Sequence, residues 1–210
     1  ERGPPVNGGA ADGREVLLLL ALGTGIGGSI MVGDRLVVGR SGYAAELGHV
    51  PVDFADPRVC LCGASGCVEQ FASARGIAEL AARTPPSPES RSRLAAMGSP
   101  EPYSARAIVA AAAEADPWAT SLLGHAGTML GRALVTLCVT LDPGTVIISG
   151  GFGNAAAPWL VPHAQAELER RWPYARERPL PPLRWDIIGP HAGATGAALL
   201  AMAEQDEGHR

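Results

Sequence analysis

Short apolar runs of strand length alternate along the chain with longer stretches of helical periodicity. The run VLLLLAL at 16–22 contains no polar position, which predicts a strand buried on both faces. The stretch SIMVGDRLVVG at 29–39 predicts two short strands that reverse at Gly33 and Asp34, so the first segment is strand, turn and strand. Two later apolar runs predict further strands, TVIISGG at 145–151 and LRWDIIG at 183–189.

Helical spacing of apolar and alanine positions occupies most of the remaining chain. It predicts helices within VEQFASARGIAELAART at 68–84, at 105–115, at 117–141, at 158–171 and, rich in alanine, at 193–205. Proline and serine at 84–104 predict an exposed excursion, and residues 1–15, without periodicity, are typical of a disordered or truncated entry. The ordered part is therefore expected at 16–205, and its alternating strands and helices predict an α/β fold.

Composition narrows the function classes. With 47% hydrophobic and 18% charged residues among 210, the chain can build a globular core. Its net charge of −4 provides no basic footprint for phosphate backbones, so we expect no nucleic acid partner. No secretion signal pattern is present and the longest apolar run, at 16–22, is too short to cross a bilayer. We therefore expect a cytoplasmic chain without membrane contact.

Three of the four cysteines stand within eight positions, in HVPVDFADPRVCLCGASGCVEQ at 49–70. With the upstream histidine they form the pattern H-x10-C-x-C-x4-C, a Cys₃His donor set for a tetrahedral zinc site made of His49, Cys60, Cys62 and Cys67. Cysteines in a chain without an export signal are expected to be reduced, which argues against a disulfide, and no C-x-x-C redox motif occurs. The remaining alternative is a set of reduced core thiols, as expected for Cys138 on its apolar helix.

Glycine-rich turns follow two of the predicted buried strands, LGTGIGG at 22–28 and ISGGFG at 148–153. Without a Cβ, glycine lets backbone N–H groups approach an anion or a flat ring, and Thr24 adds a hydroxyl donor. The alternative for either turn is a tight reversal without a ligand. The first turn is not a dinucleotide-binding fingerprint, because a strand follows it where a helix is required, and it lacks the Lys-Ser/Thr ending of a P-loop.

The cysteine segment and its flanks carry a family resemblance. GYAAELGHVPVD at 42–53, followed by CLCGASGCVEQFAS at 60–73, resembles the signature of the ROK family of repressors, open reading frames and sugar kinases. LGTGIGG is similar to the family's second phosphate loop, VIISGGFG to its adenosine-side strand and loop, and GATGAALLA to its closing helix. The resemblance implies an actin-like ATPase (ribonuclease H-like) α/β fold, of which this chain would be the C-terminal lobe, with a zinc-binding loop at 49–69.

The same resemblance implies roles for individual residues. The family's zinc ligands match His49, Cys60, Cys62 and Cys67, and its sugar-binding side chains match Glu46, His49 and Glu69. One nitrogen of the histidine would bind structural Zn²⁺ while the other faces a sugar hydroxyl. The alternatives are an exposed helix-start carboxylate at Glu46 and a dipole-complementing first-turn residue at Glu69. In the full-length parent, ATP with Mg²⁺ would be bound by Gly23, Thr24, Gly25, Gly27, Gly150 and Gly151.

Kinases of this family also carry a D-x-G-x-T stretch and an N-D-A-N-like stretch with the general-base Asp, and neither occurs here. We therefore expect the C-terminal part of a longer protein, without phosphoryl transfer of its own. The parent is expected to be a glucokinase-like, ATP-dependent kinase of a hexose or N-acetyl hexosamine, and the alternative is a repressor with this chain as its sugar-sensing effector domain. A third interpretation is a zinc-stabilised dimerisation module, and the alanine-rich helices allow a homodimer.

Overall fold

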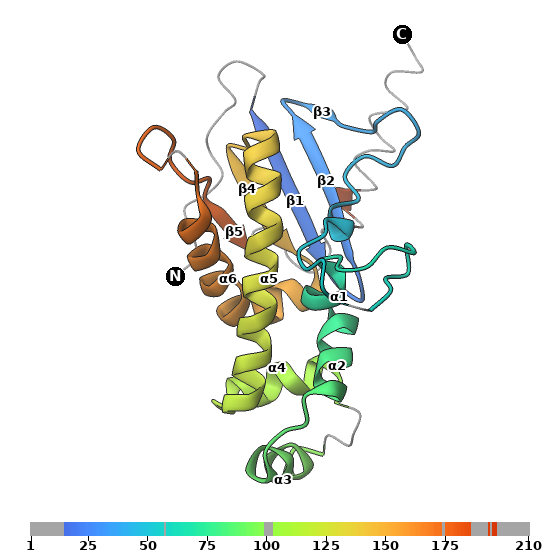
Figure 1. Ribbon diagram of the computed structural model, residues 1–210, viewed down its shortest axis with the longest axis vertical. Coiled ribbons are helices and arrows are strands. Elements are labelled where there is room, and N and C mark those ends of the chain that lie inside the picture. The colour runs from blue at the N-terminus through green and yellow to red at the C-terminus, as the bar shows by residue number, and fades with distance from the viewer. Residues whose placement is uncertain are drawn as a thin grey trace.

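The described part of the chain is built around a five-stranded mixed sheet. The computed structural model describes residues 15–56, 58–98, 103–173 and 175–185, with the single residues 193, 195 and 196. The strand order is β3-β2-β1-β4-β5 (Figure 1). The first three strands pair antiparallel, whereas β1 pairs with β4 and β4 with β5 in parallel. The strands are β1 (Val16–Leu22), β2 (Ile26–Val32), β3 (Arg35–Leu36), β4 (Thr145–Ser149) and β5 (Leu183–Trp185).

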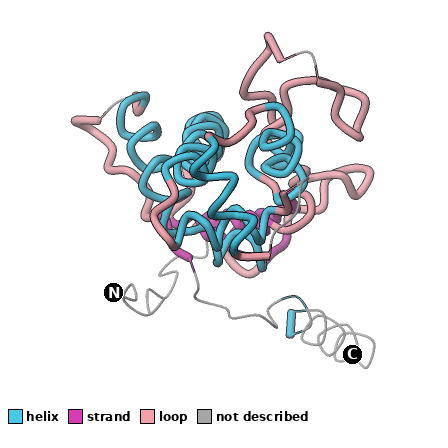
Figure 2. Tube along the Cα trace, turned by 90° about the horizontal axis from the view of Figure 1, so that it is seen from below, coloured by secondary structure: helices cyan, strands magenta, loops and turns pink. Residues whose placement is uncertain are grey.

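The first three strands form the predicted antiparallel arrangement, but β1 is less buried than predicted. β2 already begins at Ile26, inside the glycine-rich turn, and the chain reverses into β3 at Gly33, whose φ is 61°. In β1 the alternate residues Leu18, Leu20 and Leu22 are fully buried, whereas the residues between them are half-buried. Figure 2 shows the long helices on one side of the sheet. Full burial on both faces is therefore wrong for β1, whereas the prediction that β4 is a buried strand is confirmed, since all of its residues are buried.

The helices follow the predicted periodicity but differ in their boundaries. Within the described residues they are η1 (Leu47–His49, a 3-10 turn), α1 (Glu69–Ala72), α2 (Ala74–Arg83), α3 (Pro88–Ala96), α4 (Ala105–Ala113), α5 (Pro117–Leu141) and α6 (Gly151–Arg171). The single helix predicted at 68–84 is wrong at Ser73. This residue is extended (φ −94°, ψ 165°), and its Oγ accepts the Gly76 N–H at 3.0 Å, which caps α2.

Two further boundaries correct the sequence analysis. The predicted excursion contains α3, because Ser87 Oγ accepts the Ser90 N–H at 3.2 Å and Pro88 occupies the first turn, where its missing N–H costs nothing. Helix α6 begins at Gly151 rather than at 158 and continues through both of its prolines. The helix predicted at 193–205 lies almost entirely outside the described residues, as do residues 1–14 of the predicted entry.

Helices α5 and α6 pack on each other and form most of the core. The fully buried Leu130 and Leu134 of α5 lie in one cluster with Leu160 of α6. The backbones approach closely at Gly127, where a Cβ would lie 2.4 Å from the Leu160 carbonyl oxygen. By length and hydropathy α5 is the described helix that could cross a membrane, but 67% of its most apolar window is buried inside the fold, as in a core helix.

Candidate functional site

The cysteine segment folds into a compact loop between β3 and α2, here called the knuckle (residues 49–69). Its two ends meet where Pro51 and Cys67 form an antiparallel bridge. Gly66 makes this reversal possible, because its φ is 75° and a Cβ there would lie 2.0 Å from the Asp53 carbonyl oxygen. Local backbone geometry therefore brings the two ends of a segment with little regular structure together.

The knuckle gathers the four predicted metal ligands. One donor atom from each of His49, Cys60, Cys62 and Cys67 lies within 4.8 Å of all the others. The Cys62 and Cys67 Sγ atoms are 3.7 Å apart, and Cys60 Sγ is 3.6 Å from His49 Nδ1. Tetrahedral zinc, with bonds of about 2.3 Å to sulfur and about 2.0 Å to nitrogen, separates its ligands by roughly 3.5–3.8 Å. The composition of the donor set and these two separations therefore fit zinc, and all four donor atoms lie close enough to hold a metal ion.

The thiols of the knuckle differ in their electrostatic surroundings. The Ala64 backbone N–H lowers the pKa of the exposed Cys62 thiol. Burial, followed by hydrogen bonding with the other two thiols, raises the pKa of the Cys67 thiol to about 12. A divalent cation bound at this cluster would supply positive charge that favours the thiolate form.

Glu46 and His49 lie together at the ends of the 3-10 turn η1. The His49 Nδ1 atom faces Cys60, whereas its Nε2 atom lies 3.7 Å from Glu46 Oε2. The His49 side chain is 29% exposed and the Glu46 side chain is 57% exposed, so a ligand can reach both. The imidazole can thus bind a metal through one nitrogen and a polar ligand through the other.

Glu69 occupies a different position from these two residues. It is buried, and its Oε2 atom accepts the Ile26 N–H at 2.8 Å while its Oε1 atom accepts from Arg75 Nη2 at 2.6 Å. Glu69 begins α1, yet its carboxylate is held by residues outside that helix. The predicted sugar contacts of Glu46, His49 and Glu69 stay predictions, and the structure adds that Glu69 contacts the first glycine-rich turn.

The two glycine-rich turns lie at the same edge of the sheet. β1 and β4 are parallel neighbours, with Ala21 opposite Ser149, so the turns that follow them emerge side by side. In α/β sheets ligands commonly bind beyond the carboxyl ends of parallel strands. A cavity of about 400 Å³ opens here, lined by Gly23, Thr24, Ala74, Ala105, Arg106, Val109, Gly151, Phe152 and Ala155.

The predicted nucleotide-binding residues divide into two groups. A Cβ added at Gly23, Gly27 or Gly151 would meet nothing within 4 Å, so open space lies above them. At Gly25 it would lie 2.4 Å from Glu69 Oε2, and at Gly150, whose φ is 90°, 2.4 Å from a backbone carbonyl oxygen. Gly25 and Gly150 are therefore required by packing within the fold, whether or not they also contact a nucleotide.

Sequence reasoning missed two arginines of this region. Arg106 on α4 lines the cavity and makes no ion pair with another described residue. Arg75 on α2 contacts the first turn twice, through Glu69 and through its backbone N–H, which donates to the Thr24 carbonyl oxygen at 3.3 Å. Neither stands in a motif, because each reaches the site only through the packing of its helix.

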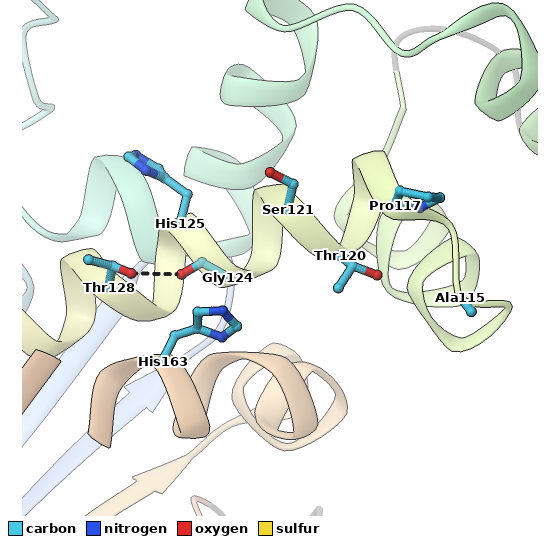
Figure 3. Close-up of a pocket in the computed structure, with 8 residues that line it drawn as sticks. All are labelled: Ala115, Pro117, Thr120, Ser121, Gly124, His125, Thr128 and His163. Carbon is cyan, nitrogen blue, oxygen red and sulfur yellow. Dashed lines mark hydrogen bonds between the residues drawn. The ribbon is translucent and has the colours of Figure 1, made fainter. Parts of the chain in front are cut away.

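A second hollow, of about 680 Å³, lies over α5 and α6 and is more open. Figure 3 shows His163 of α6 directed toward Gly124 of α5, whereas His125 points away on the other side of that helix. His163 is also bound to the Trp159 carbonyl oxygen at 2.9 Å through Nδ1. The two imidazoles do not converge, so we assign this hollow no chemistry.

Comparison with protein families and curated relatives agrees with this geometry. A family model described as the ROK family matches residues 7–204. The chain is 34% identical over 157 residues to a glucokinase of Halalkalibacterium halodurans, covering 75% of this chain and 48% of the relative. It is 31% identical over 193 residues to an N-acetylmannosamine kinase of Shigella boydii, covering 90% and 57%. The chain thus spans only about half of each relative.

Solved structures show the same relationship. A ROK family glucokinase from Streptomyces griseus, in complex with glucose and AMPPNP, superposes with a TM-score of 0.77 at 31% identity, covering 91% of this chain and 62% of that one. A ROK family transcriptional regulator superposes with a TM-score of 0.63 at 28% identity, covering 81% and 41%. The α/β fold with its mixed sheet is therefore that of ROK sugar kinases, in the actin-like ATPase class.

Proposed function

Because the chain belongs to the ROK family, we propose that it is the sugar- and nucleotide-binding C-terminal lobe of an ATP-dependent hexose kinase. The observation that carries this proposal is the cavity beyond β1 and β4, where both glycine-rich turns meet. A sugar sensor has no need of such a phosphate cradle.

Four features make this cavity suitable for ATP. The N-terminus of the 21-residue helix α6 begins at Gly151 and offers unpaired backbone N–H groups to an anion. Thr24 is exposed and provides a hydroxyl donor, and the guanidinium of Arg106 brings a positive charge. Val109 and Phe152 supply apolar surface for a base. We propose that phosphates bind the first turn and that the nucleoside lies against α4 and α6.

The sugar would bind at the knuckle. A zinc ion held by His49 and the three cysteines would fix the imidazole, so that its Nε2–H donates to a sugar hydroxyl while the Glu46 carboxylate accepts from one. Glu69, whose two oxygens already accept from Ile26 and Arg75, would add a third contact through a remaining carboxylate lone pair. Zinc acts here as a structural support and supplies no step of the reaction. The substrate class we propose is a hexose or N-acetyl hexosamine.

Phosphoryl transfer is not proposed for this chain alone. The general base that takes the proton from the attacking sugar hydroxyl would come from the N-D-A-N-like stretch, which does not occur in these 210 residues. The chain would therefore bind both substrates and orient the nucleotide, with Mg²⁺ accompanying ATP. Cytoplasmic location and homodimer formation stay predictions.

The alternative is a sugar-sensing effector domain of a repressor, which the similarity to the ROK family transcriptional regulator favours. The two proposals differ in the nucleotide, because only the kinase requires ATP. Binding of AMPPNP to the purified chain therefore discriminates between them.

Isothermal titration with AMPPNP, glucose and N-acetylmannosamine tests the proposal. The kinase interpretation predicts AMPPNP binding that Thr24→Val weakens, since this variant loses the hydroxyl donor and keeps the shape. Thr140→Val is the matched control, because among the described residues its hydroxyl bonds within α5, to the Thr136 carbonyl oxygen. Sugar binding without AMPPNP binding would favour the repressor. ATP-dependent phosphorylation of glucose by the chain alone would contradict the proposal that this chain binds both substrates but does not transfer the phosphoryl group.

A further inference from the structure

The first glycine-rich turn is held by a partly buried ion pair, between Glu69 and Arg75, that no motif predicts. The Glu69 carboxylate accepts the Ile26 N–H at 2.8 Å through Oε2 and the Arg75 guanidinium at 2.6 Å through Oε1. Glu69 and Ile26 are 43 positions apart in the sequence, so this contact joins the start of β2 to the start of α1. Both carboxylate oxygens are thus used to connect two distant segments.

The inner side of the first glycine-rich turn packs closely against the Glu69 carboxylate. A Cβ at Gly25 would lie 2.4 Å from Glu69 Oε2, so the turn closes over the carboxylate with no space to spare. The carbonyl oxygens of Gly23 and Thr24 accept the backbone N–H groups of Ala74 and Arg75, at 2.9 and 3.3 Å. The outer side of the turn, by contrast, faces open space at Gly23.

Arg75 supplies the charge that this arrangement requires. A carboxylate as buried as that of Glu69 must be paired, because an uncompensated charge in the interior is strongly unfavourable. The Arg75 side chain is 31% exposed, and its other acidic partner, Glu79, lies farther away at 3.8 Å. Without the guanidinium, the carboxylate would turn toward water and release the Ile26 N–H.

We propose that Arg75 is a positioning residue, which holds Glu69 against the Ile26 N–H and thereby keeps the first glycine-rich turn in the conformation that receives nucleotide phosphates. This inference rests on the proposed nucleotide-binding function of the turn. Arg75 does not itself touch the nucleotide, and it acts through Glu69 and through the Thr24 carbonyl oxygen.

The test compares Arg75→Met with Arg83→Met in the full 210-residue chain. Both substitutions remove a positive charge from α2, but Arg83 is exposed in the last turn of the helix, away from Glu69. Two quantities are measured: the affinity for AMPPNP by calorimetry, and the amide hydrogen exchange rate of Ile26 in the nucleotide-free chain. Zinc content is determined for each variant.

We expect Arg75→Met to weaken AMPPNP binding about ten-fold and to raise the Ile26 exchange rate by a similar factor, as for the loss of a charge-assisted hydrogen bond. Arg83→Met should change neither, and Arg75→Lys should restore part of both because it returns the charge with fewer donors. Zinc content should stay unchanged. If Arg75→Met does not fold, the comparison of Arg75→Lys with the unaltered chain decides, with faster Ile26 exchange expected.

The outcomes separate this inference from the proposed function. AMPPNP binding by the unaltered chain, with equal affinity and equal Ile26 exchange in the Arg75 variant, would overturn the inference and leave the function standing. A uniform rise of exchange throughout α2 would also overturn it, since Arg75 would then only stabilise its helix. Absence of AMPPNP binding by the unaltered chain would overturn the proposed function, whereas the Ile26 exchange rate would still report whether Arg75 holds the turn.

Discussion

Removing zinc from the knuckle should lower the melting temperature of the chain by a predictable amount. The four donor atoms converge within 4.8 Å only in the folded state, so the ion binds the native chain in preference to the unfolded one. With free zinc about 1,000-fold above its dissociation constant, this linkage contributes about 4 kcal/mol. For a domain of this size each kcal/mol changes the melting temperature by about 2–4 °C, so chelation should lower it by about 8–16 °C.

The metal-free knuckle should loosen without exposing the core. Burial and the neighbouring thiols raise the pKa of the Cys67 thiol to about 12, so it becomes a neutral thiol when zinc leaves. The buried Cys67 then carries no charge that would drive global unfolding. Faster amide hydrogen exchange is therefore expected across 58–70 in the chelated chain, while α5 and β4 stay protected.

Calorimetry with and without chelator, together with metal analysis, checks this prediction. Cys67→Ser should lose zinc and show a chelator-independent melting temperature. Cys138→Ala is the control, because Cys138 is buried in α5, away from the cluster, and this variant should keep its zinc despite a smaller core. The reasoning fails if the purified chain carries well under one zinc ion, or if chelation leaves the melting temperature unchanged.

Four other substitutions, one of them a control, test separate parts of the structure. His49→Ala should abolish both zinc and sugar binding, and full zinc retention with loss of sugar affinity alone would contradict the dual role. Gly25→Ala should lower the free energy of unfolding by about 1–3 kcal/mol because its Cβ displaces Glu69, whereas Gly27→Ala, facing open space, should stay within about 0.5 kcal/mol in urea titrations. Burial alone would raise the pKa of Glu167, but hydrogen bonds from two arginines outweigh it and hold that pKa below 4.5. This lowered pKa contributes stability above about pH 4.5 that is lost as the pH falls. Unfolding curves of Glu167→Gln should therefore be less sensitive to acid, and equal sensitivity would refute the assignment.

The sequence predicted elements well where periodicity is long and uninterrupted. The boundaries of α5 are those expected from its apolar spacing and from proline at its first turn. The predicted helix boundaries were wrong where a single side chain ends or begins a helix. Ser73 is one example, because its Oγ caps α2 and divides the predicted helix into two. The start of α3 at Ser87 and Pro88 was missed for a similar reason. Serine and proline occur both where helices end and where they begin, and only the residues that follow show which of the two applies.

The candidate metal ligands could be identified because they are close in sequence. Cys60, Cys62 and Cys67 lie within eight consecutive positions, so one short folded loop is enough to bring their sulfur atoms together. The orientation of His49 could not be predicted, since its Nε2 faces Glu46 only because of the 3-10 turn between them.

By itself, the amino-acid sequence determined the strand and helix periods, the donor set of the knuckle and the two glycine-rich turns, all of which depend on residues near one another along the chain. Only the tertiary structure decided that the two turns share one cavity, because that requires β1 to pair in parallel with β4 across more than a hundred residues. It also decided that Arg106 lines this cavity and that Glu69 and Arg75 hold the first turn. Such contacts are made by helix packing and long-range strand pairing, which leave no local pattern in the sequence.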